Sequence, residues 1–304
     1  MRRRASTRSA PHALGAFCVG AVSSLAAAAI LKGHPPGGAQ RWTRSNHAGC
    51  PVTLLEGPAY AVGVVAGALC GGAGVPAAVA GLGAGAFGAL DDLVGDGSSK
   101  GLRGHLAAVR RGELTTGAIK IVGLGVTGLA TAWVADRSRE RTGTKAAGSL
   151  ATLVGGAVVA GSANMVNLLD LRPGRALKVV LLLAVPFASG GRGSHLSTAT
   201  AAATVGAAMV ALPDDLAGRT MLGDTGANSA GALIGTALVA RAGLRGRLLA
   251  LAALTVLTLA SEKVSFTKVI ESSPSLRHRD ALGRSAQPST TAVHHGRPLG
   301  DAVT

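Results

Sequence analysis

Three short acidic motifs stand at the ends of apolar runs in this chain, and their residue types suit the binding of a cation or an anionic substrate. They are Gly-Ala-Leu-Asp91-Asp92, Asn164-Met-Val-Asn167-Leu-Leu-Asp170 and Met221-Leu-Gly223-Asp224-Thr225-Gly226. A carboxylate at a membrane boundary is costly to desolvate, so several that converge on one side usually mark a functional site. The pattern therefore predicts that the three motifs meet in space.

The composition indicates which elements must position these motifs. Mean hydropathy is +0.39, and only 15% of the residues are charged, which is typical of a multispanning membrane protein. Nine largely uncharged segments are long enough to be predicted as membrane helices, although several are near the lower limit: 11–31, 57–73, 75–90, 116–134, 147–169, 175–189, 197–212, 225–240 and 247–261. We expect an all-α polytopic helical bundle over residues 1–262, followed by a polar tail, 263–304, that is predicted to be disordered and cytoplasmic.

Threading nine spans from an outside amino end places the three acidic motifs on one face of the membrane. The same face receives all but Asp136 and Glu140 of the 15 acidic residues. Lys and Arg are divided more evenly and orient the chain less decisively. We expect the acidic face to be cytoplasmic. Arg2 to Arg4 and the apolar run behind them would also fit a cleaved secretory signal, but an uncleaved first helix is simpler because further spans follow at once.

The formal net charge of +15 would raise the question of nucleic acid in a soluble protein. Here the basic residues flank apolar spans and no aromatic-rich basic surface accompanies them, so the composition excludes nucleic-acid binding and favours anionic lipids. The 3 Cys, at positions 18, 50 and 70, have no Cys-x-x-Cys spacing and predict neither a disulfide framework nor a zinc site.

The ordered set of motifs resembles the polyprenyl-phosphate sugar-1-phosphate transferases, the membrane family that includes phospho-N-acetylmuramoyl-pentapeptide transferase and its N-acetylglucosamine-1-phosphate relatives. Asp91-Asp92 followed by Lys100-Gly-Leu resembles the family's Asp-Asp stretch and downstream Lys-Gly-Leu. The motif from Asn164 to Asp170 is similar to its Asn-x-x-Asn-Leu-x-Asp loop. The segment from Met221 to Gly226 is similar to its Phe-Met-Gly-Asp-Ser/Thr-Gly motif. The matches follow the family's order and cover about residues 45 to 262.

The resemblance implies transfer of a sugar 1-phosphate from a UDP-sugar to undecaprenyl or decaprenyl phosphate at the plasma (inner) membrane, in cell-envelope glycan synthesis. Asp91 would act as a base or position the lipid phosphate, with Asp92 supporting it near the metal. Lys100 would neutralise phosphate charge, while Asn167 and Asp170 would contact the nucleotide sugar. The reaction is either one direct displacement or passes through a covalent Asp intermediate. A homodimer is left open.

The residue types also suit this chemistry by themselves. Phosphoryl transfer brings several negative charges together, so a hard divalent cation held by Asp oxygens is the expected solution. Asp224 is the preferred ligand, with Asp92 as a second one; Mg²⁺ is expected and Mn²⁺ is an alternative. Gly223, Gly226 and neighbouring backbone amides open a predicted helix whose amino terminus would help to hold a phosphate.

Several features have a simpler structural interpretation. Lys120 and Lys178 lie just inside spans and are predicted to extend to the membrane surface. Asp214-Asp215 follows Pro213 and is predicted to lie in a loop. Asp224 would also suit a helix cap, and Asn167 and Asp170 a turn.

The chain also departs from the family pattern. Its loop reads Asp170-Leu-Arg-Pro-Gly174 where the family has a second Asp, Met221 replaces an aromatic residue, and the late His cluster is missing. We therefore expect an altered sugar specificity. The alternatives are a membrane protein that has lost catalysis and binds a lipid-linked precursor or a partner protein, and a secondary transporter.

Overall fold

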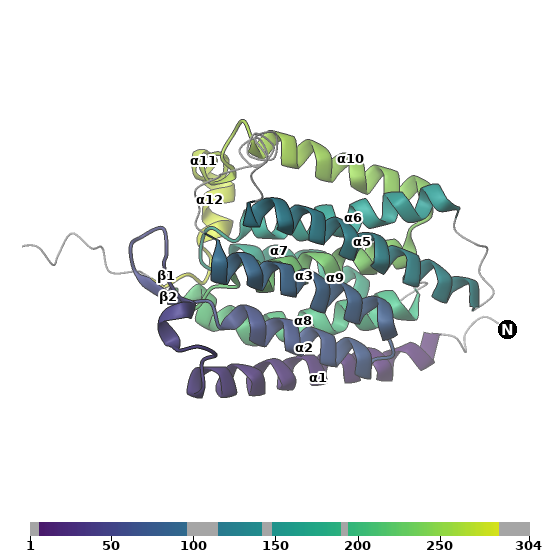
Figure 1. The fold of residues 1–304 in the computed structure, drawn as a ribbon, viewed down its shortest axis with the longest axis horizontal. Coiled ribbons are helices and arrows are strands. Elements are labelled where there is room, and N and C mark those ends of the chain that lie inside the picture. Colours follow the sequence, from purple (N-terminus) through teal and green to yellow (C-terminus); the bar gives the residue numbers. More distant parts are fainter. Residues whose placement is uncertain (1–5, 96–114, 142–147, 190–193, 286–304) are drawn as a thin grey trace, which may run out of the picture.

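The computed structural model describes residues 6–95, 115–141, 148–189 and 194–285, and its helices run alongside one another in a bundle (Figure 1). Each of the nine predicted apolar segments falls on one helix of this bundle. The helices are α1 (Ser6–Gly33), α2 (Glu56–Cys70), α3 (Gly74–Val94), α5 (Thr116–Arg141), α6 (Ser149–Leu169), α7 (Arg175–Ala188), α8 (His195–Leu216), α9 (Gly223–Arg241) and α10 (Leu244–Ser261). The described part of the chain is therefore an all-α bundle, as the sequence predicted.

Six of the described helices are long and apolar enough to cross a membrane: α1, α3, α5, α6, α8 and α10. Helix α2 is apolar but has only 15 residues, and α7 has 14. At 1.5 Å per residue, such helices are about 22 Å long, against a hydrocarbon core of about 30 Å. The six long apolar helices indicate a membrane-embedded bundle. The number of nine spans stays a prediction.

Helix α9 lies at the centre of the bundle, where it packs against α2, α3, α6 and α8. Every residue of α9 except Asp224, Leu238 and Arg241 is buried. A Cβ atom added at Gly231 would overlap the main chain of Ser162 in α6, so the absence of a side chain permits this close approach. Since neighbouring helices surround α9, its sequence can contain polar residues that a lipid-facing helix would exclude.

A short hairpin covers one end of the bundle. The 3₁₀ helix η1 (Ala39–Trp42) leads into the antiparallel strands β1 (Thr43–Ser45) and β2 (Pro51–Thr53), with Arg44 opposite Val52. The carbonyl of Thr53 accepts a hydrogen bond of 3.1 Å from the N–H of Met221, just before α9. This contact connects the start of α2 to the start of α9.

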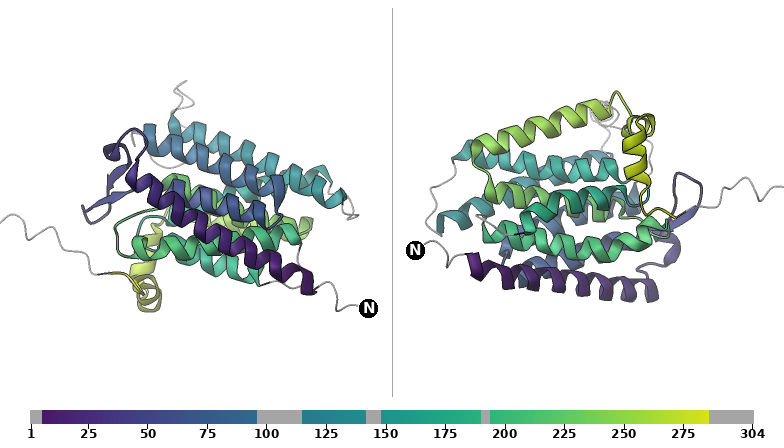
Figure 2. Two further views of the ribbon diagram at one scale, coloured as in Figure 1. Left: turned by 90° about the horizontal axis from the view of Figure 1, so that it is seen from below. Right: turned by 180° about the vertical axis from the view of Figure 1, so that it is seen from behind.

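The predicted disorder after Glu262 is wrong for the residues described there. Two short helices follow α10, α11 (Phe266–Ser272) and α12 (Pro274–Ala281), and α12 runs across the end of the bundle (Figures 1 and 2). These helices bury no residue fully and are held to the bundle by ion pairs. Their sequence is therefore polar, and its composition predicted an unstructured tail. Residues 286–304 of the predicted tail lie outside the described part.

The predicted loop at Asp214-Asp215 is also wrong. Both residues belong to the last turn of α8, with Pro213 inside the same helix. Asp215 is buried, and its Oδ1 accepts the N–H of Gly174 at 3.1 Å. This long-range hydrogen bond connects the start of α7 to the end of α8, and no local pattern in the sequence signals it.

Candidate functional site

A cavity of about 520 Å³ opens at the hairpin end of the bundle, where α3 and α6 end and α5 and α9 begin. Its wall contains residues of all three acidic motifs: Asp91, Asp92, Asn167, Asp170, Met221, Gly223 and Asp224. Arg44, Ser45, Thr115 and Thr116 complete its polar lining. The motifs therefore meet in space, as the sequence predicted, although they are far apart along the chain.

Asp92 attaches the end of α3 to the start of α9. Its Oδ1 accepts the backbone N–H of Asp224 at 3.0 Å, and its Oδ2 accepts the N–H and the hydroxyl of Thr225 at 2.9 and 2.6 Å. A carboxylate at this position satisfies the exposed N–H groups of the first turn and interacts favourably with the helix dipole. Two of the amides near Gly223 and Gly226 that we expected to hold a phosphate, those of Asp224 and Thr225, are thus already bonded to Asp92. These contacts make Asp92 a positioning residue for Asp224, and its contact with a metal stays a prediction.

Lys120 joins two further carboxylates of the cavity, those of Asp91 and Asp224. Its Nζ lies 2.6 Å from Oδ2 of Asp91 and also donates to Oδ2 of Asp224. All three side chains are mostly buried, with exposed fractions of 15%, 19% and 21% for Lys120, Asp91 and Asp224. The prediction that Lys120 extends to the membrane surface is therefore wrong. A single Lys early in an otherwise apolar segment was the available signal, and an intramembrane charge of this kind usually has a functional partner.

Arg44 is a second cation that the sequence analysis did not single out. It belongs to β1 and lines the cavity, and its guanidinium donates to the carbonyls of Arg41, Thr43 and Asp92. These hydrogen bonds hold the cationic group at the rim of the cavity. A guanidinium in this place suits contact with a phosphate oxygen.

Asn167 and Asp170 come from the end of α6. Asp170 is only 4% exposed, and its Oδ2 has no hydrogen-bond partner among the described residues. The pKa of Asp170 is raised well above its ordinary value. Burial is the main cause, and the nearby carboxylate of Asp215 is the second. A carboxyl group that keeps its proton can donate a hydrogen bond, so Asp170 is suited to contact a polar group of a ligand.

The remaining predicted residues are placed differently from one another. Met221 and Gly223 line the cavity, and Gly223 has a φ of 59°, which favours glycine at the turn into α9. Gly226 lies outside the cavity wall, because it packs against Gly57 of α2 and its N–H donates to the carbonyl of Leu222. Lys100 lies outside the described residues.

The donor set of the cavity fits a divalent cation. Four carboxylates line it, Arg44 is the cation among its described lining residues, and Lys120 pairs with two of the four carboxylates. No group of three acidic, His or Cys side chains in the described residues is arranged as a complete metal site. Mg²⁺ commonly uses only one or two protein carboxylates and takes further oxygens from substrate phosphates and water. Asp91 and Asp224, which share one ammonium group, are the two carboxylates that such a partial site would use.

Comparison with known proteins assigns no relative. No family model matches this chain, and no curated protein matches it. The chain's function is therefore inferred from the cavity and from the resemblance of its motifs.

Proposed function

We propose that this protein is a multi-pass membrane transferase that moves a sugar 1-phosphate from a UDP-sugar to a polyprenyl phosphate. The observation that carries the proposal is the convergence of the three motifs on one cavity, where Lys120 joins Asp91 to Asp224. Anionic donor and acceptor groups require nearby positive charge and a cation site; Lys120 and Arg44 supply positive charge, and the carboxylates of the cavity are the groups that we propose to hold the cation.

The proposed reaction assigns separate tasks to the residues of the cavity. An oxygen of the lipid phosphate attacks the phosphorus that carries the sugar, the bond from that phosphorus to the oxygen of the nucleoside monophosphate breaks, and UMP leaves. Bound Mg²⁺ would be held by Asp224 and Asp91 and would neutralise charge on the phosphates. Lys120 and Arg44 stabilise further negative charge on the phosphates. Asp92 keeps Asp224 in place through the start of α9.

The location of the cavity suits both substrates. It opens at the end of the bundle, beside helices whose outer faces expose large apolar side chains, such as Leu90 and Val94 on α3. A soluble UDP-sugar would enter from the cytoplasm, and the polyprenyl chain would remain among the lipids. We place this end of the bundle on the cytoplasmic side of the plasma membrane, where the product would serve synthesis of a cell-envelope glycan.

The specificity is expected to differ from that of the family's standard members. Arg172 and Pro173 stand in the loop where the family has a second Asp, and Met221 offers a thioether instead of an aromatic face. These differences concern the part of the donor that lies beyond the phosphates. We therefore propose a different sugar on the donor.

The test is release of labelled UMP from a panel of UDP-sugars by purified protein with undecaprenyl phosphate, with and without Mg²⁺. Asp224→Asn removes one carboxylate from the cavity. Asp214→Asn, which removes a carboxylate outside the cavity, is the matched control. Asp214 pairs with Lys32 and Arg219 outside the cavity. Mg²⁺-dependent release that Asp224→Asn abolishes and Asp214→Asn preserves supports the transferase. No release from folded protein with any donor overturns it.

A non-catalytic membrane protein that binds a lipid-linked precursor or a partner protein is the second candidate. The observation that favours it is that Lys120 neutralises Asp91 and Asp224 within the protein itself. Under this alternative, Asp224→Asn would leave binding of polyprenyl phosphate unchanged, and no donor would release UMP.

A further inference from the structure

The loop between α6 and α7 is short, and its first residue, Asp170, lies in the wall of the candidate cavity. Leu171 lines the same cavity and is 55% exposed. Because α7 begins at Arg175, contacts that hold residues 172–175 also restrict where Asp170 and Leu171 can lie. The position of this wall therefore depends on what the loop contacts.

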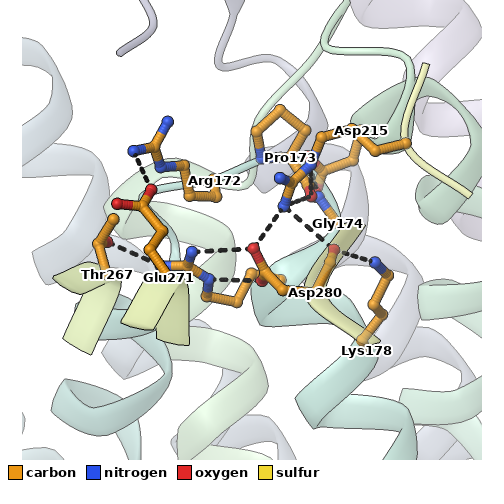
Figure 3. Close-up of polar contacts among 10 residues, drawn as sticks. Arg172, Pro173, Gly174, Lys178, Asp215, Thr267, Glu271 and Asp280 are labelled. Atoms are coloured by element: carbon orange, nitrogen blue, oxygen red, sulfur yellow. Dashed lines mark hydrogen bonds and ion pairs between the residues drawn. The ribbon is translucent and has the colours of Figure 1, made fainter. Parts of the chain in front are cut away.

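The loop is held by the tail cluster, which we define as Arg172, Arg175, Lys178, Glu271, Asp280 and Arg284 (Figure 3). Asp280 of α12 is its centre. Its carboxylate accepts Nε and Nη2 of Arg175 at 2.7 and 3.0 Å and Nη2 of Arg284 at 3.0 Å. Its main-chain carbonyl accepts a hydrogen bond from Nζ of Lys178 at 2.7 Å. The prediction that Lys178 extends to the membrane surface is therefore wrong.

Other contacts hold the loop residue by residue. Arg172 pairs with Glu271 at 2.7 Å, and Arg284 donates to the carbonyl of Pro173 at 3.1 Å. The N–H of Gly174 donates to Asp215, and Arg175 donates to the hydroxyl of Thr267 at 2.9 Å. Residues of α8, α11, α12 and the segment after α12 thus contact four successive positions of the chain.

Burial distinguishes the contacts that matter most. The side chains of Arg175 and Asp280 are 4% and 11% exposed, whereas Glu271 is 50% exposed. A bidentate pair shielded from water loses much more when one partner is removed than an exposed pair does, because the other charge remains buried. Loss of Asp280 would leave Arg175 without its carboxylate partner at the end of the loop.

We infer that Asp280 is a positioning residue for the cavity, acting through Arg175 and Arg284 on the loop that carries Asp170 and Leu171. The tail helices therefore support, from outside the cavity, the loop that forms part of its wall. The inference rests on the proposed function for what the cavity binds, but the mechanical connection is independent of it. Since the loop carries a residue expected to contact the nucleotide sugar, disturbance of the loop weakens binding of that donor and leaves the acceptor site largely intact.

The experiment combines a reporter on the loop with steady-state kinetics. The three free cysteines, Cys18, Cys50 and Cys70, are replaced by Ala, and Leu171→Cys is introduced as the reporter. The rate of labelling by a charged maleimide is compared with and without Asp280→Asn in the full-length protein. We expect Asp280→Asn to accelerate labelling about tenfold, because it allows the loop to open locally.

The kinetic readout separates positioning from a general loss of structure. In the chain without the reporter, Asp280→Asn should raise KM for the UDP-sugar about tenfold, while kcat and KM for the lipid phosphate change less than about threefold. Thr267→Val removes the hydroxyl that accepts one hydrogen bond from Arg175 without removing a charge, and it should give a smaller change in the same direction. It provides a second test if Asp280→Asn does not fold.

Glu271→Gln is the matched control, because it removes one charge that α11 places against the same loop, at an exposed pair with Arg172, and should alter labelling less than about twofold. Unchanged labelling in folded Asp280→Asn and Thr267→Val proteins overturns the inference, as does an equal acceleration by Glu271→Gln. If the wild-type protein transfers no sugar phosphate, the proposed function fails, whereas the labelling result still decides whether the tail positions the loop.

Discussion

The two ends of the bundle use charged residues in opposite ways. At the cavity end, Asp91 and Asp224 share Lys120, and Asp170 has an oxygen without a partner among the described residues. Toward the other end, Asp136 of α5 pairs with Arg247 of α10, and their side chains are 4% and 1% exposed. Asp136 follows Lys120 on the same helix at a distance of about 24 Å.

The Asp136–Arg247 pair satisfies its hydrogen-bonding groups fully. Arg247 uses all of its N–H donors. Nη1 and Nη2 each donate to Asp136, and the remaining N–H groups donate to the carbonyls of Val239, Ala242 and Ala151. Thr152 also donates to Asp136 at 2.8 Å. The hydrogen bonds of this network are made within the protein, whereas the carboxylates of the candidate cavity have shared or missing partners and are suited to bind a ligand. This difference separates the structural acids from the candidate functional ones.

The largest effect on stability is expected from breaking the pair of Asp136 and Arg247. Arg247→Met leaves Asp136 buried without a cation and should lower the free energy of unfolding by about 3–5 kcal/mol. Thermal unfolding of the purified protein in detergent measures the loss. Activity per folded molecule should be retained, and a selective loss of activity would contradict the structural role of this end.

The largest effect on activity is expected from removing the ammonium group that Asp91 and Asp224 share. Lys120→Gln removes the ammonium between Asp91 and Asp224 and should reduce the rate of sugar-phosphate transfer about 10²–10³-fold. The rate of UMP release measures it, with unfolding temperature as a control for structure. Full activity of the variant would place Lys120 outside the chemistry.

A smaller effect of Lys120→Gln concerns the cation. Because the ammonium and a divalent cation would use the same carboxylates, removal of Lys120 should increase the affinity for Mg²⁺ about tenfold. The concentration of Mg²⁺ that produces half of the maximal thermal stabilisation reports this affinity. If Mg²⁺ stabilises neither protein, the carboxylates do not form a cation site in the absence of substrate.

The smallest effect is a pH dependence at the tail. Burial alone would raise the pKa of Asp280, but hydrogen bonds from Arg175 and Arg284 outweigh it and lower the pKa below its ordinary value. The ion pairs of Asp280 therefore stabilise the fold above an ordinary carboxyl pKa of about 3.9, and this contribution is lost as the pH falls through the lowered value.

The measurement is the difference in unfolding temperature between wild type and Asp280→Asn at neutral pH and at about pH 3. Asp280→Asn should be less stable at neutral pH, and the difference should shrink on acidification. A difference that grows at low pH would show that Asp280 does not act through its charge.

The sequence predicted regular features better than individual contacts. Apolar runs marked the long helices of the described bundle, because a helix in lipid must satisfy its backbone internally and cover itself with apolar side chains. It misplaced Asp214-Asp215 because Pro and Asp are typical of loops, although here they end α8. It missed Arg44 because a basic residue in a polar connection has no local mark of function. The roles of Lys120 and Asp280 were equally hidden, since their partners lie far away along the chain.

The amino-acid sequence by itself determined that the chain is a helical membrane protein and that its acidic motifs stand at helix ends. Hydropathy and residue type are local properties, and they suffice for those conclusions. Only the tertiary structure decided which carboxylate does what: Asp92 caps α9, Asp91 and Asp224 share Lys120, and Asp280 holds the loop of Asp170. The physical reason is that the role of a charge depends on its partners and its burial, and both arise when distant segments pack together.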